Sequence, residues 1–270
     1  MTKKQERARA RRRWERRQVK LADRATRRTR LRTITAAVAT LVAVLALAVW
    51  VGLSRAGEGS RTASGASPSS TASFPPGCSA PPPPPGTSAQ LTLPDPALVA
   101  GGQWEATVTT NCGDIVIDLD AAAAPQAVAS FVQLARADYW LNAPCHRLVA
   151  EPAMTVLQCG DPTGTGGGTP GYGFGVENAP NDGVYDRGVV AMARTSDTHK
   201  GNGGQFFFVA EKTTIPDPVG YTVFGRVRQG LDIVDSIVAG GVAPGGTSAT
   251  DGTPKVPISI LRVAVTEKKA

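Results

Sequence analysis

The amino-acid sequence predicts a mainly β domain over residues 101–270, with eight strands and two helices, preceded by a transmembrane helix and a disordered linker. Three observations support this prediction. Apolar and polar residues alternate in short segments after residue 101, as in half-buried strands. An uncharged run of 20 residues, 34–53, is long enough to cross a bilayer. Between the two, Ser, Thr, Gly, Ala and Pro dominate, a composition that buries too little apolar surface to fold.

The basic residues are concentrated at the N-terminus. The 270 residues carry a net charge of +7, but residues 1–32 hold 15 Lys or Arg against three acids, which gives +12, and the remainder carries −5. A nucleic-acid-binding domain would carry its basic stripe on the fold itself, so no specific nucleic acid partner is expected. We interpret residues 1–32 as a basic cytoplasmic tail that could be attracted to anionic lipid.

The apolar run follows this basic block directly. As a helix it would span about 30 Å, the thickness of a bilayer core. Because positive flanks stay in the cytoplasm, we predict a single-pass transmembrane helix over residues 33–53, in the lipid bilayer of the cell membrane through residues 34–53, with the C-terminal domain extracytoplasmic. A cleaved signal peptide, cut near Ala56, is the alternative, although the run exceeds the usual apolar length of such signals.

Residues 54–100 are predicted to form a Ser/Pro/Gly-rich linker. They include five consecutive prolines, 81–85, which favour an extended and semi-rigid chain. A structureless loop of this length would be uncommon inside a compact domain, so a stalk between membrane and domain is the better interpretation.

The domain over residues 101–270 is built mainly from period-two segments. Two of them flank Asn111-Cys112-Gly113-Asp114, as in a β-hairpin. Apolar stripes at helical spacing predict helices over residues 125–137 and 231–238. The absence of a sequence repeat of 20 to 50 residues argues against a propeller or solenoid. The eight strands, which suggest a barrel, are expected at residues 105–110, 115–119, 146–149, 155–159, 189–193, 205–209, 222–227 and 258–265.

The sequence lacks the residues or motifs that several kinds of enzyme chemistry require. With only two histidines, His146 and His199, and no Gly-x-Ser-x-Gly motif, a hydrolytic triad is disfavoured. Residues 166–171 match the spacing G-x-G-x-x-G, but Pro170 precludes the helix that would hold a pyrophosphate. The four cysteines lack Cys-x-x-Cys spacing, so a structural zinc site is not expected.

Polar side chains on three predicted strands could line one groove. Alternation places Gln205 and Phe207 on one face of their strand, and Val156 and Gln158 on one face of theirs. Arg147 lies on the strand at residues 146–149. Taken alone, Arg147 would more often be a solvated charge and Phe207 a core residue. Together they indicate a candidate site that needs neither a nucleophile nor a metal.

Five motifs in this domain resemble those of the cyclophilin family of peptidyl-prolyl isomerases. They occur in family order, and the resemblance covers nearly all of residues 101–267. With the predicted tail, span and linker, the layout is similar to that of membrane-anchored extracytoplasmic cyclophilins of actinobacteria. The motifs are Cys145-His146-Arg147-Leu148, Leu157-Gln158-Cys159-Gly160-Asp161-Pro162-Thr163-Gly164-Thr165-Gly166-Gly167, Val190-Ala191-Met192-Ala193-Arg194, Gly204-Gln205-Phe206-Phe207 and Val223-Phe224-Gly225.

The resemblance implies a closed eight-stranded antiparallel barrel capped by two helices, with a groove that accepts a Xaa-Pro peptide. It also implies peptidyl-prolyl cis/trans isomerase activity (EC 5.2.1.8), without a cofactor or metal. Arg147 and Gln158 would be catalytic, with Gln158 orienting the arginine. The substrate-binding residues that it implies are Val156, Gly164, Ala193, Arg194, Gln205, Phe207, Ile215 and Tyr221.

The chemistry can be argued from the peptide bond itself. Rotation meets a barrier of roughly 18–20 kcal/mol because the nitrogen lone pair is delocalised into the carbonyl. A guanidinium is always charged and has several donors, so Arg147 could bond the prolyl nitrogen as it becomes pyramidal. This stabilisation accelerates rotation only if it is stronger in the twisted state than in the planar ones.

The candidate groove departs from the family pattern in its walls. Thr155 and Val156 stand where many members have a Phe-Met pair, Ile215 where many have Trp, and Arg194 where many have Asn. Met154 could fill the gap left by Thr155. These changes bear on turnover, peptide preference and cyclosporin affinity.

The four cysteines would face an oxidising compartment and allow three disulfide pairings. Cys145 and Cys159 lie on neighbouring predicted strands, but strict alternation puts them on opposite faces, so their bond would need a bulge. Cys78 could then pair with Cys112.

We expect an anchored isomerase that acts as a folding factor on Pro-containing segments of exported polypeptides, where the uncatalysed step takes tens to hundreds of seconds. One alternative is a non-catalytic or weakly catalytic proline-peptide-binding module or chaperone at the membrane. Another is a membrane-organising protein in which the cationic tail matters most.

Overall fold

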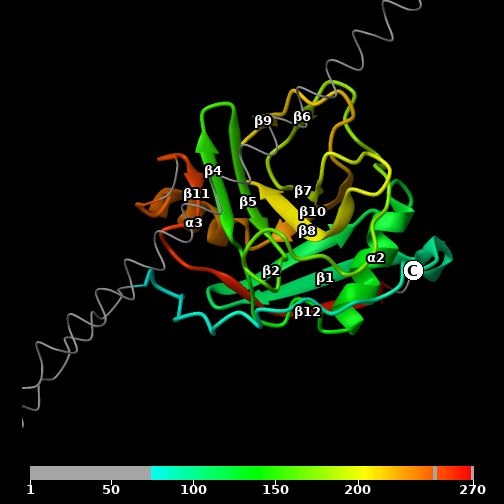
Figure 1. Ribbon diagram of the computed structural model, residues 1–270, viewed down its shortest axis with the longest axis horizontal. Helices are drawn as coiled ribbons and strands as arrows, with labels where there is room; N and C mark the ends of the chain where they lie inside the picture. The colour runs from blue at the N-terminus through cyan, green and yellow to red at the C-terminus, as the bar shows by residue number, and fades with distance from the viewer. Residues whose placement is uncertain (1–73, 246–247, 269–270) are drawn as a thin grey trace, which may run out of the picture. The chain divides into compact units, whose positions relative to one another are not determined.

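One curled sheet of ten strands forms the centre of the computed structural model, which describes residues 74–245 and 248–268 (Figure 1). Its order is β11-β4-β5-β8-β7-β10-β2-β1-β12-β3, and all its pairs are antiparallel. The strands are β1 (Gln103–Thr110), β2 (Gly113–Leu119), β3 (Ala143–Pro144), β4 (Arg147–Glu151), β5 (Met154–Cys159), β7 (Val189–Arg194), β8 (Asn202–Val209), β10 (Val223–Gln229), β11 (Asp251–Gly252) and β12 (Ser259–Lys268), with β6 (Val184–Tyr185) and β9 (Thr213–Thr214) paired separately.

The sheet confirms the eight predicted strands but not the closed barrel. Each predicted strand corresponds to one of the longer strands, whereas β3, β6, β9 and β11 are two residues long and carry too short a pattern to be predicted. The edge strands β11 and β3 are not paired with each other in the described part of the chain. Because a two-residue strand offers almost no ladder for a further partner, the sheet remains an open half-barrel.

Both predicted helices are present, and their ends are held by contacts from elsewhere. The helix α2 (Pro125–Arg136) begins with proline, and its first turn lacks a side-chain cap from Ala124. The carboxylate of Glu177 takes this role by accepting the N–H of Gln126 at 3.1 Å and of Ala127 at 2.9 Å. Negative charge at a helix N-terminus is favourable because unpaired N–H groups lie there.

The second helix, α3 (Leu231–Gly240), starts at a tight turn. Its preceding residue, Gly230, is left-handed with φ of 86°, and a Cβ there would lie 2.3 Å from the carbonyl oxygen of Asp114. Only glycine fits both requirements. The turn therefore lets α3 approach the β1–β2 hairpin closely.

The main core lies between the sheet and α2. Phe131 of α2 packs against Trp140, Phe206 and Phe224 with ring-centre distances of 4.5, 5.6 and 5.3 Å. All four are at most 2% exposed. Alternation along β8 sends Phe206 into this core, so its neighbours Gln205 and Phe207 face the other side of the sheet, as predicted.

Residues 74–95 form an extended N-terminal strap along one side of the domain (cyan in Figure 1). The backbone N–H of Gly86 donates to Pro162 O at 3.1 Å, and that of Leu91 donates to Pro170 O at 2.7 Å. Gln90 Nε2 donates to Thr169 O at 3.0 Å. The strap thus spans the ends of the glycine-rich loop formed by residues 160–171.

The strap continues into a short 3-10 helix, η1 (Pro96–Val99), which packs on α2. Val99 is 1% exposed, and its carbonyl accepts the indole N–H of Trp104. Residues 74–100 therefore differ from the predicted disordered linker, because specific contacts compensate for a composition that is typical of disorder. Residues 54–73 lie outside the described chain.

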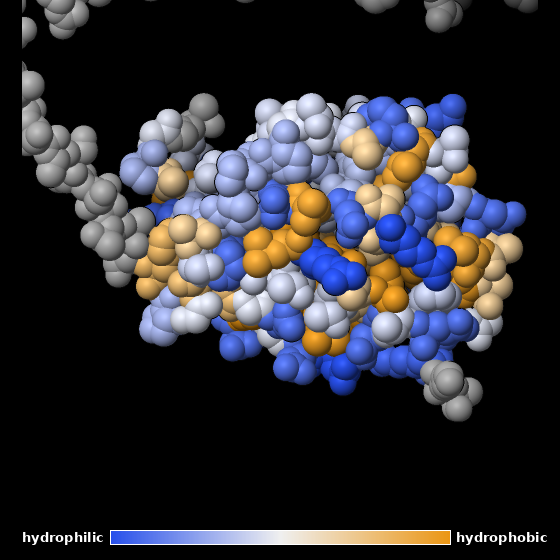
Figure 2. Space-filling view, turned by 90° about the horizontal axis from the view of Figure 1, so that it is seen from below, coloured by the Kyte–Doolittle hydropathy of each residue, from blue (hydrophilic) through white to orange (hydrophobic). Residues whose placement is uncertain are grey.

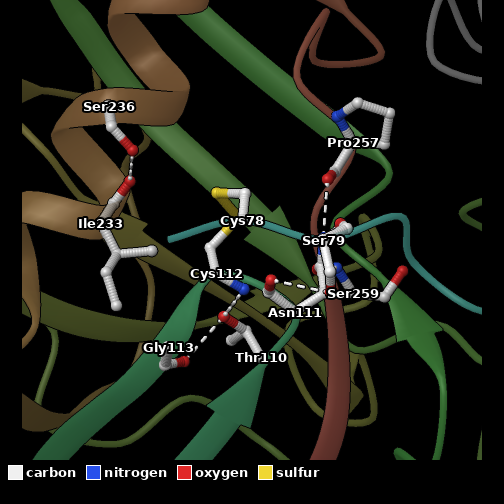
Figure 3. The surroundings of a disulfide bond; sticks show 10 residues. All are labelled: Cys78, Ser79, Thr110, Asn111, Cys112, Gly113, Ile233, Ser236, Pro257 and Ser259. Atoms are coloured by element: carbon white, nitrogen blue, oxygen red, sulfur yellow. Dashed lines mark hydrogen bonds between the residues drawn. A yellow bond between two sulfur atoms is a disulfide. The ribbon is translucent and has the colours of Figure 1, made fainter. Parts of the chain in front are cut away.

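The strap is fastened by a disulfide and a buried asparagine (Figure 3). Cys78 is bonded to Cys112 in the β1–β2 turn. Next to it, Asn111 is 5% exposed; its Nδ2 donates to Ser79 O at 2.7 Å, and its Oδ1 accepts the N–H of Ser259 at 2.7 Å. One side chain thus joins the strap, the hairpin and β12.

The surface seen from below the view of Figure 1 is mixed in character. Hydrophobic residues there are interrupted by hydrophilic ones (Figure 2). Among the described residues, the large hydrophobic side chains that are exposed include Leu93 of the strap and Leu98 of η1.

No helix in residues 74–245 and 248–268 has the length and apolar character needed to span a membrane. The predicted tail, 1–32, and the predicted span, 33–53, lie outside these residues.

Candidate active site

One row of side chains crosses five neighbouring strands on the face opposite the main core. In the register of the sheet, Arg147 of β4 is opposite Gln158 of β5, which is opposite Phe207 of β8. The row continues to Ala191 of β7 and Val223 of β10. Since directly paired residues point to the same face, the register brings the predicted arginine, glutamine and phenylalanine together.

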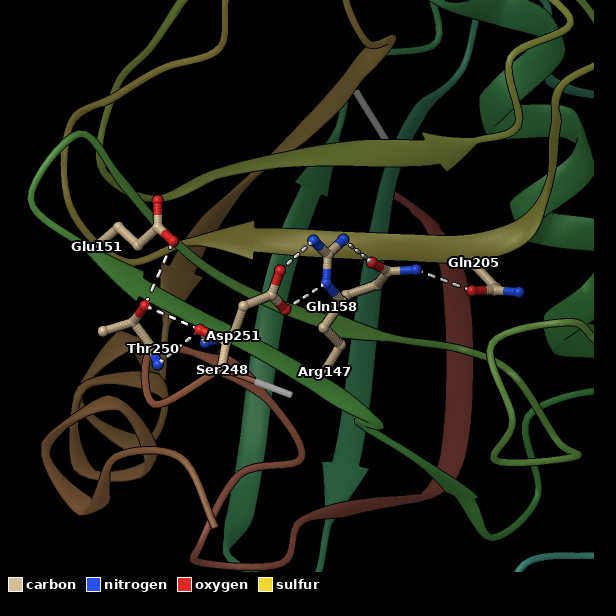
Figure 4. Close-up of polar contacts among 7 residues, drawn as sticks. All are labelled: Arg147, Glu151, Gln158, Gln205, Ser248, Thr250 and Asp251. Carbon is tan, nitrogen blue, oxygen red and sulfur yellow. Dashed lines mark hydrogen bonds and ion pairs between the residues drawn. The ribbon is translucent and has the colours of Figure 1, made fainter. Parts of the chain in front are cut away.

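A chain of hydrogen bonds links the polar members of this face (Figure 4). Arg147 Nη1 donates to Gln158 Oε1 at 3.4 Å, and Gln158 Nε2 donates to Gln205 Oε1 at 2.9 Å. Gln205 Nε2 in turn donates to the carbonyls of Gly166 and Gly168, at 2.9 and 3.1 Å. The orientation of Arg147 is therefore connected to the glycine-rich loop.

Arg147 has a second partner that the sequence did not predict. Asp251 of β11 accepts from Nε and Nη2 of Arg147, each at 2.7 Å. The hydrogen bond between them raises the pKa of Arg147 and lowers the pKa of Asp251. The arginine is thus charged and held from two sides, by Asp251 and by Gln158.

An apolar cluster lies beside the polar row. Phe207 and Val156 are its buried members in the site, at 5% and 7% exposed. Met154, Ile215 and Tyr221 are partly buried against it, together with Ala193. Met154 packs against this cluster, on the same face of β5 as Val156, while Thr155 points to the other face and donates its hydroxyl to Glu151 O.

Arg194 lies at the far end of this cluster. Its guanidinium carbon is 4.9 Å from the ring centre of Tyr221, which packs edge-on against Phe207 with a ring-centre distance of 5.6 Å. Arg194 Nη2 also donates to Asp217 Oδ1 at 2.6 Å, and Nε donates to Gly220 O at 2.8 Å. The side chain of Arg194 therefore supports the turn formed by residues 217–221.

The glycine-rich loop is organised by Asp161, which is fully buried. Burial alone would raise the pKa of Asp161, but hydrogen bonds from Thr163 and from the N–H groups of Gly168 and Gly166 lower it. A Cβ at Gly168 would lie 1.9 Å from the carboxylate, so the loop can close around Asp161 only with glycine there.

Two hollows meet at Gln158 and Gly166, which line both. One, of about 350 Å³, lies between the glycine-rich loop and β7–β8 and includes Ala193, Arg194 and Gln205. The other, of about 480 Å³, lies beside Arg147 and Asp251.

Of the residues expected to bind substrate, Ala193, Arg194 and Gln205 line the first hollow, whereas Val156, Phe207, Ile215 and Tyr221 belong to the apolar cluster and line neither hollow. Gly164 lies apart from both groups. It lines neither of these two hollows, and a Cβ there would lie 3.3 Å from Pro144 Cγ and 3.8 Å from Pro84 Cγ. Gly164 thus faces the strap side of its loop. Gly166, two residues later, is the glycine that borders both hollows.

A disulfide between Cys145 and Cys159 lies next to the catalytic candidates. Each cysteine is close in sequence to one of them, Cys145 to Arg147 and Cys159 to Gln158. Cys145 lies before β4 begins, so strict alternation with Arg147 does not apply and the bond forms without a bulge in the β4–β5 pairing. With Cys78–Cys112, this disulfide leaves no free cysteine in the described residues.

His146 lines the hollow beside Arg147. Burial lowers its pKa, and its Nδ1 has no hydrogen-bond partner among the described residues. In the part of the chain that the structure describes, His, Cys, Asp and Glu side chains form no group of three or more suited to hold a metal ion.

Comparison with known proteins gives a consistent result for this domain. The family model for cyclophilin type peptidyl-prolyl cis-trans isomerase/CLD matches residues 106–265. The chain is 38% identical over 181 residues to a probable peptidyl-prolyl cis-trans isomerase B of Mycobacterium tuberculosis, and 39% identical over 178 residues to that of Mycobacterium leprae. These matches cover 63% and 62% of the chain, and 55% and 56% of the two relatives' own lengths.

Among solved structures, a cyclophilin type peptidyl-prolyl cis-trans isomerase of Cryptosporidium parvum, crystallised in the presence of the dipeptide Ala-Pro, is similar to this domain. The TM-score is 0.50 at 27% identity, and the match covers 61% of the chain and 99% of that structure.

Proposed function

Because the chain belongs to the cyclophilin type peptidyl-prolyl cis-trans isomerase family, we propose that its domain accelerates cis/trans isomerisation at Xaa-Pro bonds. The observation that carries the proposal is the row of Arg147, Gln158 and Phe207 across β4, β5 and β8. It sets a charged donor beside an apolar surface, as a prolyl imide requires.

The proposed mechanism follows from the donors of Arg147. A guanidinium has five N–H groups. Nε and Nη2 each use one on Asp251, and Nη1 uses one on Gln158, so one N–H on Nη1 and one on Nη2 remain. A remaining N–H can bond the prolyl nitrogen when rotation localises its lone pair. In planar cis and trans states that lone pair is delocalised, so the bond favours the twisted state.

The other side chains of the face would bind the substrate around this point. Phe207, with Val156, Met154 and Ile215, gives the prolyl ring an apolar surface. Gln205, Ala193 and Arg194 line the 350 Å³ hollow, where the backbone of Ala193 and Arg194 could pair with a flanking peptide. Tyr221 is turned toward Phe207 and could close the edge of the surface.

A protease-free isomerisation assay on a Xaa-Pro peptide tests this proposal. We expect the full chain to accelerate exchange, and Arg147→Ala to lower kcat/KM by about 10²-fold or more, as for loss of a principal electrostatic group. Arg262→Ala is the matched control, because Arg262 is an exposed arginine on β12. Equal rates for Arg147→Ala and the wild type would contradict the mechanism.

A binding module with little turnover is the second candidate, and the burial of Phe207 favours it. At 5% exposed, this ring offers a prolyl side chain little surface beside Arg147 unless Met154, Ile215 or Tyr221 moves, whereas the 350 Å³ hollow remains open to the rest of a peptide. Titration of the same peptide, followed by NMR, separates the two functions. Saturable binding with exchange at the background rate would indicate a proline-peptide-binding module or chaperone.

We further propose that the domain acts on exported polypeptides while anchored by residues 34–53. Two disulfides are typical of proteins in an oxidising compartment, and the dense basic block before the apolar run favours a cytoplasmic N-terminus. The domain should sediment with membranes and be cleaved by protease added outside intact cells. A shortened chain released into the medium would instead indicate a cleaved signal peptide.

A further inference from the structure

The ion pair between Arg147 and Asp251 has a geometry suited to fixing the arginine. The two carboxylate oxygens accept from Nε and Nη2 at 2.7 Å each, which is the two-pronged arrangement that defines the plane of a guanidinium (Figure 4). Gln158 accepts from Nη1 on the other side. Together the two partners leave the arginine only small freedom to rotate.

Asp251 is itself held in place. Its backbone N–H donates to Ser248 Oγ at 3.2 Å, and its strand, β11, pairs with β4 so that Asp251 is opposite Val149. The preceding Thr250 is bonded to β4 twice, through its carbonyl to Ala150 N–H and through its hydroxyl to Glu151. The carboxylate is thus attached to the same strand as the arginine that it contacts.

This pair has little to contribute to folding. The side chains of Arg147 and Asp251 are 45% and 34% exposed, and ion pairs at this exposure add little to stability because water screens them. Its effect on function can be larger, since a long side chain with several rotatable bonds is otherwise free to leave the orientation that a reaction needs.

We propose that Asp251 is a positioning residue, which holds the guanidinium of Arg147 in the orientation that bonds the twisted prolyl nitrogen. The inference rests on the proposed isomerase function. The negative charge of Asp251 also offsets part of the positive charge of Arg147. This effect by itself would weaken the electrostatic field of the arginine at the prolyl nitrogen. At an open, solvated site the alignment of a direct hydrogen bond matters more than that residual field, so removal of Asp251 should slow turnover.

Isomerisation by the full chain provides the test. Asp251→Ala should lower kcat by about ten-fold or more while KM changes by less than about two-fold, because orientation affects the twisted state rather than peptide binding. Asp251→Asn, whose amide oxygen can still accept one N–H, should recover part of the loss. In an Arg147→Ala background, Asp251→Ala should have no further effect.

A second carboxylate provides a matched control. Asp235 also forms a two-pronged pair with an arginine, accepting from Nη1 and Nη2 of Arg187 at 2.7 and 2.6 Å, with similar exposure and away from the two hollows. Asp235→Ala should leave kcat unchanged. Unchanged or raised turnover in Asp251→Ala, or an undiminished loss in the Arg147→Ala background, would overturn the proposal.

An NMR measurement separates this inference from the proposed function. The Nε–H signal of Arg147 should be protected from solvent exchange in the wild type and in Asp235→Ala, and lose protection in Asp251→Ala. If the wild type itself shows only background isomerisation, the proposed function fails, while the signal still reports whether Asp251 orders the arginine. An equally unprotected signal in all three proteins would overturn the positioning role directly.

Discussion

Arg194 lies over the ring of Tyr221, with its guanidinium carbon 4.9 Å from the ring centre. The arginine side chain is only 5% exposed and is also paired with Asp217. Arg194 therefore supports one side of the Tyr221 ring, and the same ring packs against Phe207 in the apolar cluster.

Arg194→Leu should loosen this support. We expect a loss of about 1–2 kcal/mol in the free energy of unfolding, from the cation–π contact and the hydrogen bonds to the 217–221 turn, together with a higher KM. Urea unfolding and the isomerase assay would measure both. Arg226→Ala removes an exposed arginine that donates to Arg187 O and serves as the control. Similar unfolding curves for the two variants would contradict the supporting role.

Asn111→Ala should destabilise the domain more than an ordinary polar substitution. It leaves the N–H of Ser259 and the carbonyl of Ser79 without partners at a site where Asn111 is 5% exposed, so we expect a loss of about 2–4 kcal/mol. Gln133→Ala removes one exposed hydrogen bond to Thr92 of the strap and should cost less than about 1 kcal/mol. Denaturant titration measures both, and equal costs would refute a special role for Asn111.

The two disulfides should contribute differently to stability and to activity. Cys78–Cys112 closes a separation of 34 residues and Cys145–Cys159 one of 14, so the chain-entropy model gives about 4 and about 3 kcal/mol of stability. Replacing the first pair by serine should therefore cost more stability. Replacing the second should cost more activity, because its cysteines adjoin Arg147 and Gln158. Unfolding and turnover of both double variants test this, and the reverse ranking would contradict it.

Stability should depend on pH through His146. Its pKa in the folded domain is below the ordinary value of 6.5 because it is buried, so the unfolded chain binds more protons between those two values. The free energy of unfolding should therefore fall as the pH decreases from about 7 to about 5. His146→Gln should flatten this part of the curve. An unchanged slope in this variant would exclude His146 as the source.

The parts of the site that the sequence predicted were those governed by strand periodicity. Gln205 and Phe207 share a face because β8 alternates, and the register of β4, β5 and β8 then brings Arg147 and Gln158 to the same place. Alternation also explains why Thr155, one residue before Val156, points away. These relationships depend on local pattern, which a sequence displays directly.

The unpredicted parts depend on contacts between distant segments. Asp251 is 104 residues from Arg147 and follows a turn, so no spacing connects them. Gly164 and Gly166 belong to the same motif, and the motif alone does not show that Gly166 is the one that borders both hollows. The strap itself has the composition of a linker and is ordered by Cys78 and Asn111, whose partners become visible only in the fold.

The strap also decides where a recombinant form of this domain should begin. A boundary at residue 101, where the composition changes, would leave Cys112 as an odd thiol, able to cross-link two molecules during purification. A form that starts at residue 74 retains Cys78, the disulfide partner of Cys112, and the strap that contacts the glycine-rich loop. Losses of yield or turnover in a shorter form would then reflect the missing segment rather than a weak enzyme.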